Sequence, residues 1–203
     1  MKREVLILDF DGVIVITQYL MIQYVEEKYL ISIKPEDLDA MSIVEVVNKK
    51  TNLNLTFESF YWDFTENFSM SFDWHREVDI MPFADQVIPE LTHKYNVYLS
   101  TARNYAGFDV INYILRRHGI SNLFKGYHFI YHFNKKYEFI KRPKMEFISS
   151  FGGKASFFMD DSVYEIEETK KIIPSLLFDP YGHKSVEGTW TVNSWLEAAQ
   201  ILL

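Results

Sequence analysis

The sequence contains no cysteine among its 203 residues. It therefore has no disulfide framework, no thiol nucleophile and no thiolate ligands for zinc or an iron–sulfur cluster. Positive charge is also in deficit, because 21 lysines and arginines stand against 28 aspartates and glutamates, which gives a net charge of −7. This balance argues against a broad surface for nucleic-acid polymers or anionic membranes. A small phosphorylated metabolite stays compatible with it if cations are concentrated locally.

Long apolar runs are absent as well. No stretch approaches the ~20 apolar residues that span a bilayer, so no membrane partner is expected. The apolar run near the N-terminus, residues 5–8, is too short for a signal peptide. The sequence therefore predicts a soluble, cytoplasmic protein. At this length we expect one domain, or one domain with a modest insertion.

What the sequence does have is an alternation of short apolar runs with helix-like segments. The apolar runs cover residues 5–8, 97–99, 127–131, 157–159 and 176–178, and the helix-like segments cover residues 84–95, 107–118, 143–151 and 163–172. Short continuous apolar runs are typical of strands that are buried on both faces. Strands that alternate with helices in this way predict βαβ units and an α/β fold with a doubly wound parallel sheet.

The alternation is interrupted once, between the first strand and the helix that begins near Ala84. Three further helix-like stretches fill the interruption, at residues 17–29, 35–49 and 56–68. The second has Pro35 in its first turn, and Thr56 is a plausible N-cap of the third. We therefore predict a small helical cap domain at residues 15–80, inserted after the first strand of a core domain that comprises residues 1–14 and 81–203.

The predicted cap is rich in aromatic side chains. Most of them are expected to form the core of the cap itself and its contact with the sheet. A nucleotide substrate would give a minority of them a use in recognition, because base–aromatic stacking contributes ~1–3 kcal/mol per base in proteins that bind single strands. The candidates for that minority are Tyr19, Phe57, Tyr61 and Trp62.

Two pairs of aspartates follow two of the predicted strands. Asp9 and Asp11 come after the first strand, and Asp160 and Asp161 come after the run at 157–159. Ligand sites in open α/β sheets lie at the carboxyl ends of strands, so the two pairs are expected to converge. Carboxylates that lie so close together repel each other unless a hard cation compensates their charge, and oxygen ligands suit Mg²⁺. A solvated turn for the first pair and helix capping for the second are the alternatives.

Hydroxyl groups and cations occur at two further places. Ser100, Thr101 and Arg103 follow the second strand. The hydroxyls and neighbouring backbone N–H groups could hold a phosphoryl oxygen, while Arg103 could bind phosphate or form a structural ion pair. Lys141 and Lys144 precede or open the helix before the strand at 157–159. A lysine at that helix start could meet both the acidic cluster and an incoming anion.

Four features follow one another along the chain: the first aspartate pair, the hydroxyls after the second strand, the lysine at the helix start and the second aspartate pair. In this order they resemble the motifs of phosphatases of the haloacid dehalogenase (HAD) superfamily, and the resemblance covers essentially the whole chain. Asp9-Phe10-Asp11-Gly12 is similar to the first motif of that superfamily, and Asp160-Asp161 to the fourth. Thr101-Ala102-Arg103 resembles a Thr-x-Arg variant of the second motif, which favours Thr101 over Ser100. Lys144 is favoured for the third, because it directly opens the helix. The resemblance implies a Rossmann-like HAD core.

The same resemblance implies an enzyme, a Mg²⁺-dependent phosphomonoester hydrolase with Mg²⁺ as its cofactor. Asp9 would attack phosphorus and form an aspartyl-phosphate, and Asp11 would protonate the leaving oxygen and then activate water. The implied metal ligands are Asp9, the backbone carbonyl of Asp11, and Asp160 or Asp161, and the implied phosphate-binding residues are Thr101, Ala102 and Lys144.

The C-terminal part of the sequence suggests a substrate. Residues 158–162, 177–181 and 192–195 look like the 5'(3')-deoxyribonucleotidase-type branch, with Pro180-Tyr181-Gly182 where members commonly have Pro-Tyr-Asn. A nucleoside monophosphate is therefore the expected substrate. The alternatives are a phosphatase or phosphomutase for sugar phosphates or other small metabolites, and a non-enzymatic scaffold that binds a phospholigand. The oligomeric state stays open.

The six histidines and the last tryptophan are interpreted structurally. His128 and His132 are taken as residues of a strand surface, and His75 as an isolated residue. Trp195 is expected to anchor the final helix to the core rather than to contact a ligand.

Overall fold

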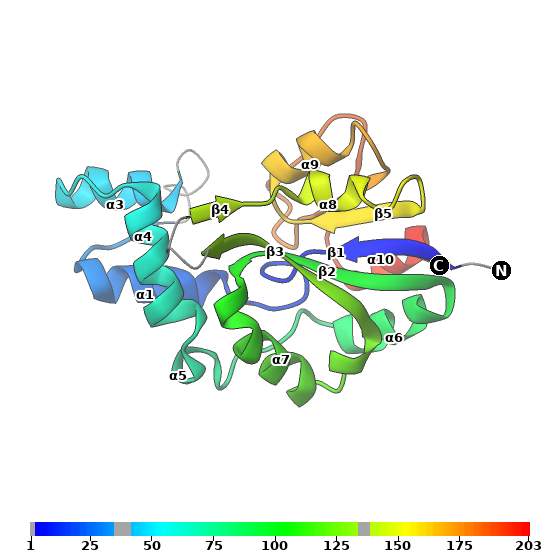
Figure 1. The fold of residues 1–203 in the computed structure, drawn as a ribbon, viewed down its shortest axis with the longest axis horizontal. Helices are drawn as coiled ribbons and strands as arrows, with labels where there is room; N and C mark the ends of the chain where they lie inside the picture. Colours follow the sequence, from blue (N-terminus) through cyan, green and yellow to red (C-terminus); the bar gives the residue numbers. More distant parts are fainter. Residues whose placement is uncertain (1–2, 35–41, 134–138) are drawn as a thin grey trace.

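A sheet of seven strands forms the centre of the protein (Figure 1). The structure is a computed structural model that describes residues 3–34, 42–133 and 139–203. The strands lie in the order β4-β3-β2-β1-β5-β6-β7, and neighbours are parallel except for β3 and β4. Their bounds are β1 Glu4–Leu8, β2 Tyr95–Asn104, β3 Phe124–Phe133, β4 Phe139–Lys141, β5 Ala155–Asp160, β6 Ser175–Phe178 and β7 Trp190–Val192.

Helices cover both faces of this sheet. Helices α6 (Ala84–Lys94), α7 (Phe108–Arg117) and α10 (Trp195–Leu202) share one hydrophobic cluster with Leu6 and Leu8 of β1. The opposite face of β1 presents Val5 and Ile7, which belong to a second cluster with residues of α8 (Lys144–Ser149) and α9 (Val163–Thr169). Because both faces of the strand are buried, its sequence is a continuous apolar run. The predicted doubly wound α/β sheet is confirmed.

The helices between β1 and α6 gather beyond the carboxyl ends of the strands, at the left of Figure 1. They share their own hydrophobic cluster, which includes Val46, Val47, Phe60 and Phe68. The helices are α1 Gln18–Tyr29, α3 Ile43–Thr51, α4 Phe57–Phe64 and α5 Phe72–His75, and a π-helical turn, Thr65–Ser69, continues α4. We use the word cap for this group.

Side-chain caps set where two of these helices begin. The Ser42 side chain accepts a hydrogen bond from the backbone N–H of Glu45, and the backbone N–H of Ser42 donates to the Glu45 carboxylate, a capping box that starts α3 at Ile43. Thr56 caps α4, as its sequence position predicts. The helix expected at residues 35–49 therefore differs in its bounds, and the expected first-turn position of Pro35 lies outside the described residues.

The chain crosses twice between the core and the cap, and the two crossings pair with each other. Val15 forms an antiparallel bridge with Ile80. On either side of it, the backbone N–H of Ile16 donates to Asp79 and that of Met81 donates to Ile14, over 2.9 and 2.8 Å. These hydrogen-bonded residues lie where the sequence predicts the two boundaries of the cap. That the cap is a separate domain stays a prediction.

The two edge strands were not predicted. Both β4 and β7 have three residues, and β7 exposes Trp190 and Thr191, so neither has the pattern of a buried strand. The expected role of Trp195 is confirmed, because its side chain is buried and its indole N–H donates to the carbonyl of Val13 over 2.9 Å. Across the described ranges, no helix is long and apolar enough to cross a membrane.

Candidate active site

Two neighbouring strand ends bring three aspartates together. Asp9 follows β1, and its backbone N–H donates to Met159 of β5, one residue before Asp160. Asp9, Asp160 and Asp161 each offer a carboxylate oxygen that lies within 4.8 Å of those of the other two. The sequence-based expectation that the two acidic pairs converge is thus met by these three residues.

Lys144 connects two of the three carboxylates. Its ammonium group donates to Asp9 over 2.6 Å and to Asp160 over 2.5 Å, and its side chain is almost completely buried. The lysine stands at the first position of α8, where Pro143 ends the extended segment before it. Lys141, the alternative, has its ammonium group 6.0 Å from the ring centre of Tyr164 instead. The structure therefore brings Lys144 to the aspartates.

The neighbouring lysines do not balance the charge of this cluster, because Lys144 and, 3.7 Å from Asp161, Lys184 stand against three carboxylates. Burial raises the pKa of Asp9 well above its ordinary value, and the charges of Asp160 and Asp161 raise it further against the lowering effect of Lys144. Burial and the charge of Asp160 also raise the pKa of Asp161, to about 6. Burial would lower the pKa of Lys144, but the charges of Asp160 and Asp9 raise it overall. A divalent cation held by oxygen ligands fits this excess of negative charge.

Gly12 allows the turn after β1 to pass close to Asp161. Its φ is +77°, a conformation that glycine adopts without a steric penalty. A Cβ atom at this position would lie 2.5 Å from a carboxylate oxygen of Asp161. Glycine is therefore required here both by the backbone and by the neighbouring acid.

Asp11 is held apart from the other acids by its own partners. Thr17 donates to Oδ1 over 2.6 Å, and Arg103 donates through Nε to Oδ2 and through Nη2 to Oδ1, over 2.9 and 2.8 Å. Burial raises the pKa of Asp11, but the charge of Arg103 and the hydrogen bonds from Arg103 and Thr17 outweigh it and lower the pKa. The resemblance implies an Asp11 that carries a proton, whereas this arrangement favours the carboxylate, which accepts one.

Arg103 has a further neighbour that the sequence analysis missed. The ring of His75 is completely buried, and its Nδ1 lies 2.8 Å from the carbonyl of Ser71, so Nδ1 carries the proton. The other ring nitrogen, Nε2, then accepts from Nη2 of Arg103 over 3.0 Å. The interpretation of His75 as isolated is wrong. Burial, followed by the charge of Arg103, lowers the pKa of His75 to about 4.

Replacement of His75 should reduce the acid sensitivity of the fold. The folded-state pKa of about 4 lies below the ordinary value of about 6.5, so the unfolded chain binds more protons and stability falls as the pH drops from about 6.5 towards 4. When the pH falls from 7 to 5, we expect the unfolding free energy of the wild type to fall by ~2 kcal/mol more than that of His75→Gln. Urea unfolding at both pH values measures it. The exposed His93, changed to Gln, is the control, and equal pH slopes for wild type and His75→Gln would contradict the assignment.

The hydroxyls of Ser100 and Thr101 both form hydrogen bonds within the protein. Ser100 and the half-buried His128 are joined by a hydrogen bond of 2.9 Å, while Thr101 accepts from the backbone N–H of Arg103 over 3.1 Å. Both hydroxyl-bearing side chains are buried, and neither lines the cavity described below, whereas Ala102 does. Phosphate binding by Thr101 and Ala102 stays a prediction.

A cavity of about 390 Å³ lies between the carboxyl end of the sheet and the cap. Its floor contains the three aspartates, Asp11, Arg103 and Lys144. Of the four rings proposed to face a ligand, those of Phe57 and Tyr61 line it, and those of Tyr19 and Trp62 do not. Tyr61 also joins the cap to the core, because its hydroxyl donates to the carbonyl of Ala102 over 2.6 Å. Phe60, Phe64 and Phe68 complete the aromatic part of the wall.

Comparison with known proteins identifies the architecture. No family model and no curated protein matches the sequence. Among solved structures, a candidate phosphatase from Clostridium difficile superposes with a TM-score of 0.68 at 19% identity, over 100% of both chains. YfnB from Bacillus subtilis, a candidate HAD hydrolase bound to magnesium, has a TM-score of 0.59 at 15% identity, over 100% of this chain and 99% of that one. The chain has the HAD-type fold.

A third protein with the HAD-type fold has been solved with ligands. CbbY from Rhodobacter sphaeroides, in complex with phosphate, superposes with a TM-score of 0.68 at 13% identity, over 97% of this chain and 96% of that one. A mutant of CbbY has been solved with xylulose-(1,5)bisphosphate. The predicted Rossmann-like HAD core is confirmed by these likenesses, and the deoxyribonucleotidase-type branch stays a prediction.

Proposed function

We propose that this protein is a Mg²⁺-dependent phosphomonoester hydrolase that acts through an aspartyl-phosphate. The observation that carries the proposal is the position of Asp9, Asp160 and Asp161 with Lys144 at the floor of a cavity at the carboxyl end of the sheet. The HAD-type fold, which is shared with candidate phosphatases, supports it.

The three aspartates fit the metal that the proposal requires. Asp9, Asp160 and Asp161 would hold Mg²⁺, which prefers oxygen ligands and would neutralise charge on the phosphoryl group. The magnesium bound in YfnB is a further argument, because that protein shares the fold. A role for the backbone carbonyl of Asp11 as an additional ligand is part of the same proposal.

The chain supplies the covalent chemistry through two residues. A carboxylate oxygen of Asp9 would form a bond to phosphorus while the bond from phosphorus to the alcohol oxygen breaks, and the alcohol would take a proton from Asp11. Asp11 would then accept a proton from the water that hydrolyses the aspartyl-phosphate. The bond from phosphorus to Asp9 would break in this second step. The hydrogen bonds from Arg103 favour the ionised form of Asp11, which suits the second step, and the first step requires that Asp11 keep the proton it takes from water until the next ester binds.

The phosphoryl oxygens need donors on the side of the cavity floor. Lys144 already contacts Asp9, so its ammonium group is placed beside the proposed nucleophile. The backbone at Ala102, an exposed residue near the carboxyl end of β2 that lines the cavity, could donate to a second oxygen. Thr101 is proposed to support this segment of backbone through its bond with Arg103.

Two classes of small substrate follow from different observations. The aromatic wall of the cavity favours a nucleoside monophosphate, the substrate predicted from the sequence, because every base has a face that can stack. The bisphosphate complex of CbbY favours a sugar phosphate by analogy. A binding scaffold without activity is the remaining alternative.

Release of inorganic phosphate from a panel of nucleoside monophosphates and sugar phosphates, with and without Mg²⁺, tests the proposal. We expect Mg²⁺-dependent release, with kcat/KM about 10-fold higher for the best nucleotide than for the best sugar phosphate. Higher values for the sugar phosphates would refute the nucleotidase specificity. Background rates with every ester, together with binding of phosphate, would favour the scaffold.

A further inference from the structure

The cap wall of the cavity is built from apolar side chains that lie on one helix face. Along α4 and the π-helical turn, each of five aromatic residues has another member of the set three or four positions away, which places them on one broad side: Phe57, Phe60, Tyr61, Phe64 and Phe68. The planes of neighbouring rings are nearly parallel at two places, with centres 5.7 Å apart for Phe57 and Tyr61 and 5.9 Å apart for Phe60 and Phe64. Met21, Ile43 and Val44 extend the apolar surface. The wall therefore offers ring faces and alkyl groups.

The polar groups of this wall are few, and most of them are already used. Thr17 donates to Asp11, Ser42 is bound to Glu45 in the capping box, and the Tyr61 hydroxyl donates to the core. Gln18 is the remaining polar side chain from the described part of the cap, residues 15–34 and 42–80, and it is exposed. Sugar hydroxyls that lie against this wall would lose water without gaining partners, at a cost in free energy.

The cavity also lacks a place for a second phosphate among the residues that the structure describes. Its lining there contains two cations, Arg103 and Lys144, and both contact carboxylates at the floor. The described cap contributes no charged side chain to the lining, and Glu165 adds a negative charge at the core side. A second phosphoryl group near the cap would be desolvated without a counter-charge.

We infer that the substrate is a monophosphate ester whose alcohol carries an aromatic or comparable apolar ring, rather than a bisphosphate or the ester of a polyhydroxy alcohol that has no such ring. The inference rests on the proposed function and specifies the leaving group of that reaction. The phosphate lies at the acidic floor, and the ring lies against the aromatic wall. The cavity volume of about 390 Å³ is within the range of small-molecule sites.

A matched set of esters tests the inference without interference from leaving-group chemistry. The esters 2-phenylethyl phosphate, glycerol 1-phosphate and ribose 5-phosphate all release primary alcohols, and fructose 1,6-bisphosphate adds a second phosphate. We expect kcat/KM for 2-phenylethyl phosphate to exceed that of each of the other three by at least about 10-fold, the usual scale of discrimination by an apolar pocket. Equal or higher values for any polyhydroxy ester or for the bisphosphate would overturn the inference.

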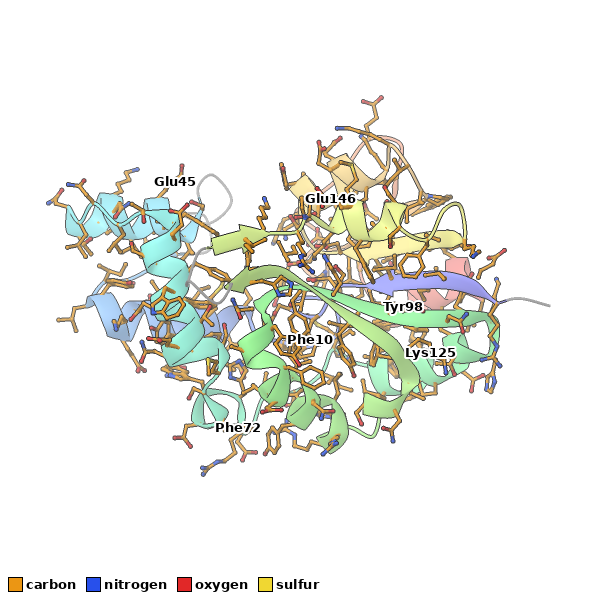
Figure 2. All side chains as sticks on the ribbon, in the orientation of Figure 1. Phe10, Glu45, Phe72, Tyr98, Lys125 and Glu146 are labelled. Carbon is orange, nitrogen blue, oxygen red and sulfur yellow. The ribbon has the colours of Figure 1, made fainter. Side chains whose placement is uncertain are left out.

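A pair of variants shows whether the wall causes the preference. Phe57 lines the cavity and is partly exposed, so Phe57→Ser removes a ring with little disturbance of the cap core. We expect the ratio of kcat/KM for 2-phenylethyl phosphate to that for glycerol 1-phosphate to fall by about 10-fold in this variant. Phe72, which Figure 2 shows on α5, has a similar exposure and is not part of the cavity lining, so Phe72→Ser should keep the wild-type ratio. An unchanged ratio in Phe57→Ser would contradict the role of the wall.

The outcomes separate this inference from the proposed function. Absence of phosphate release from every ester would refute the hydrolase proposal and the inference with it. Release from all esters at similar kcat/KM would refute the inference alone, because the hydrolase chemistry would then be present without the preference.

Discussion

Asp9→Asn should lower Mg²⁺-dependent phosphate release by at least about 10³-fold, because an amide cannot replace the carboxylate as the attacking group. The substitution preserves the size of the side chain. It also removes one negative charge from a buried cluster in which Asp160 and Asp161 raise the pKa of Asp9. The variant is therefore expected to fold at least as stably as the wild type, so that the loss of activity reports chemistry. Steady-state phosphate release and thermal unfolding measure the two quantities.

Asp79→Asn is the matched control for this experiment. Asp79 is exposed and lies at the crossing between core and cap, outside the cavity lining. We expect it to retain the wild-type rate. An acid-quenched reaction of the wild type should contain a phosphorylated peptide that includes Asp9, and this peptide should be absent from Asp9→Asn. Similar rates for Asp9→Asn and the wild type would rule out the proposed nucleophile.

Removal of divalent metal should have the second largest effect. Excess chelator is expected to lower phosphate release by at least about 10²-fold, because Asp9, Asp160 and Asp161 would then face the phosphoryl group with the ammonium groups of Lys144 and Lys184 as their cations among the described residues. Addition of Mg²⁺ should restore the rate. Mg²⁺ should also raise the midpoint of thermal unfolding, because a ligand that binds only the folded state stabilises it.

A monovalent salt at the same ionic strength separates metal binding from general screening of charge. Sodium chloride weakens interactions between exposed charges, whereas a bound divalent ion acts at the buried cluster. We expect no recovery of activity with the sodium salt. Hydrolysis that continued unchanged in excess chelator would contradict the role proposed for Asp160 and Asp161.

Much of the candidate site could be predicted because it depends on where strands end. The runs before Asp9 and before Asp160 are apolar and short, so the order of a parallel sheet places both acids at one edge. Lys144 could be chosen over Lys141 because it opens a helix, and the structure shows the expected contact with the acids. These predictions needed only local patterns and one rule of topology.

The neighbours of Arg103 could not be predicted in the same way. His75 lies on a four-residue helix of the cap, 28 positions from Arg103, and no local pattern links the two. The wall of the cavity could be predicted only in part: two of the four candidate rings, Phe57 and Tyr61, line it, and its other three rings belong to the majority expected to form the cap core and its contact with the sheet. Phe60 and Phe68 are in fact buried in that core and also line the cavity, so the two roles were not exclusive.

The paired crossings between core and cap have a mechanical consequence for substrate exchange. Backbone hydrogen bonds join Ile16 to Asp79 and Met81 to Ile14, so the two crossings form one paired, two-stranded connection rather than two independent linkers. We expect such a two-stranded connection to bend perpendicular to the plane of its two segments and to resist twisting. The cap would then rotate relative to the core about a single hinge axis. Rotation of the cap about this axis would also have to break the hydrogen bond from the Tyr61 hydroxyl to the carbonyl of Ala102.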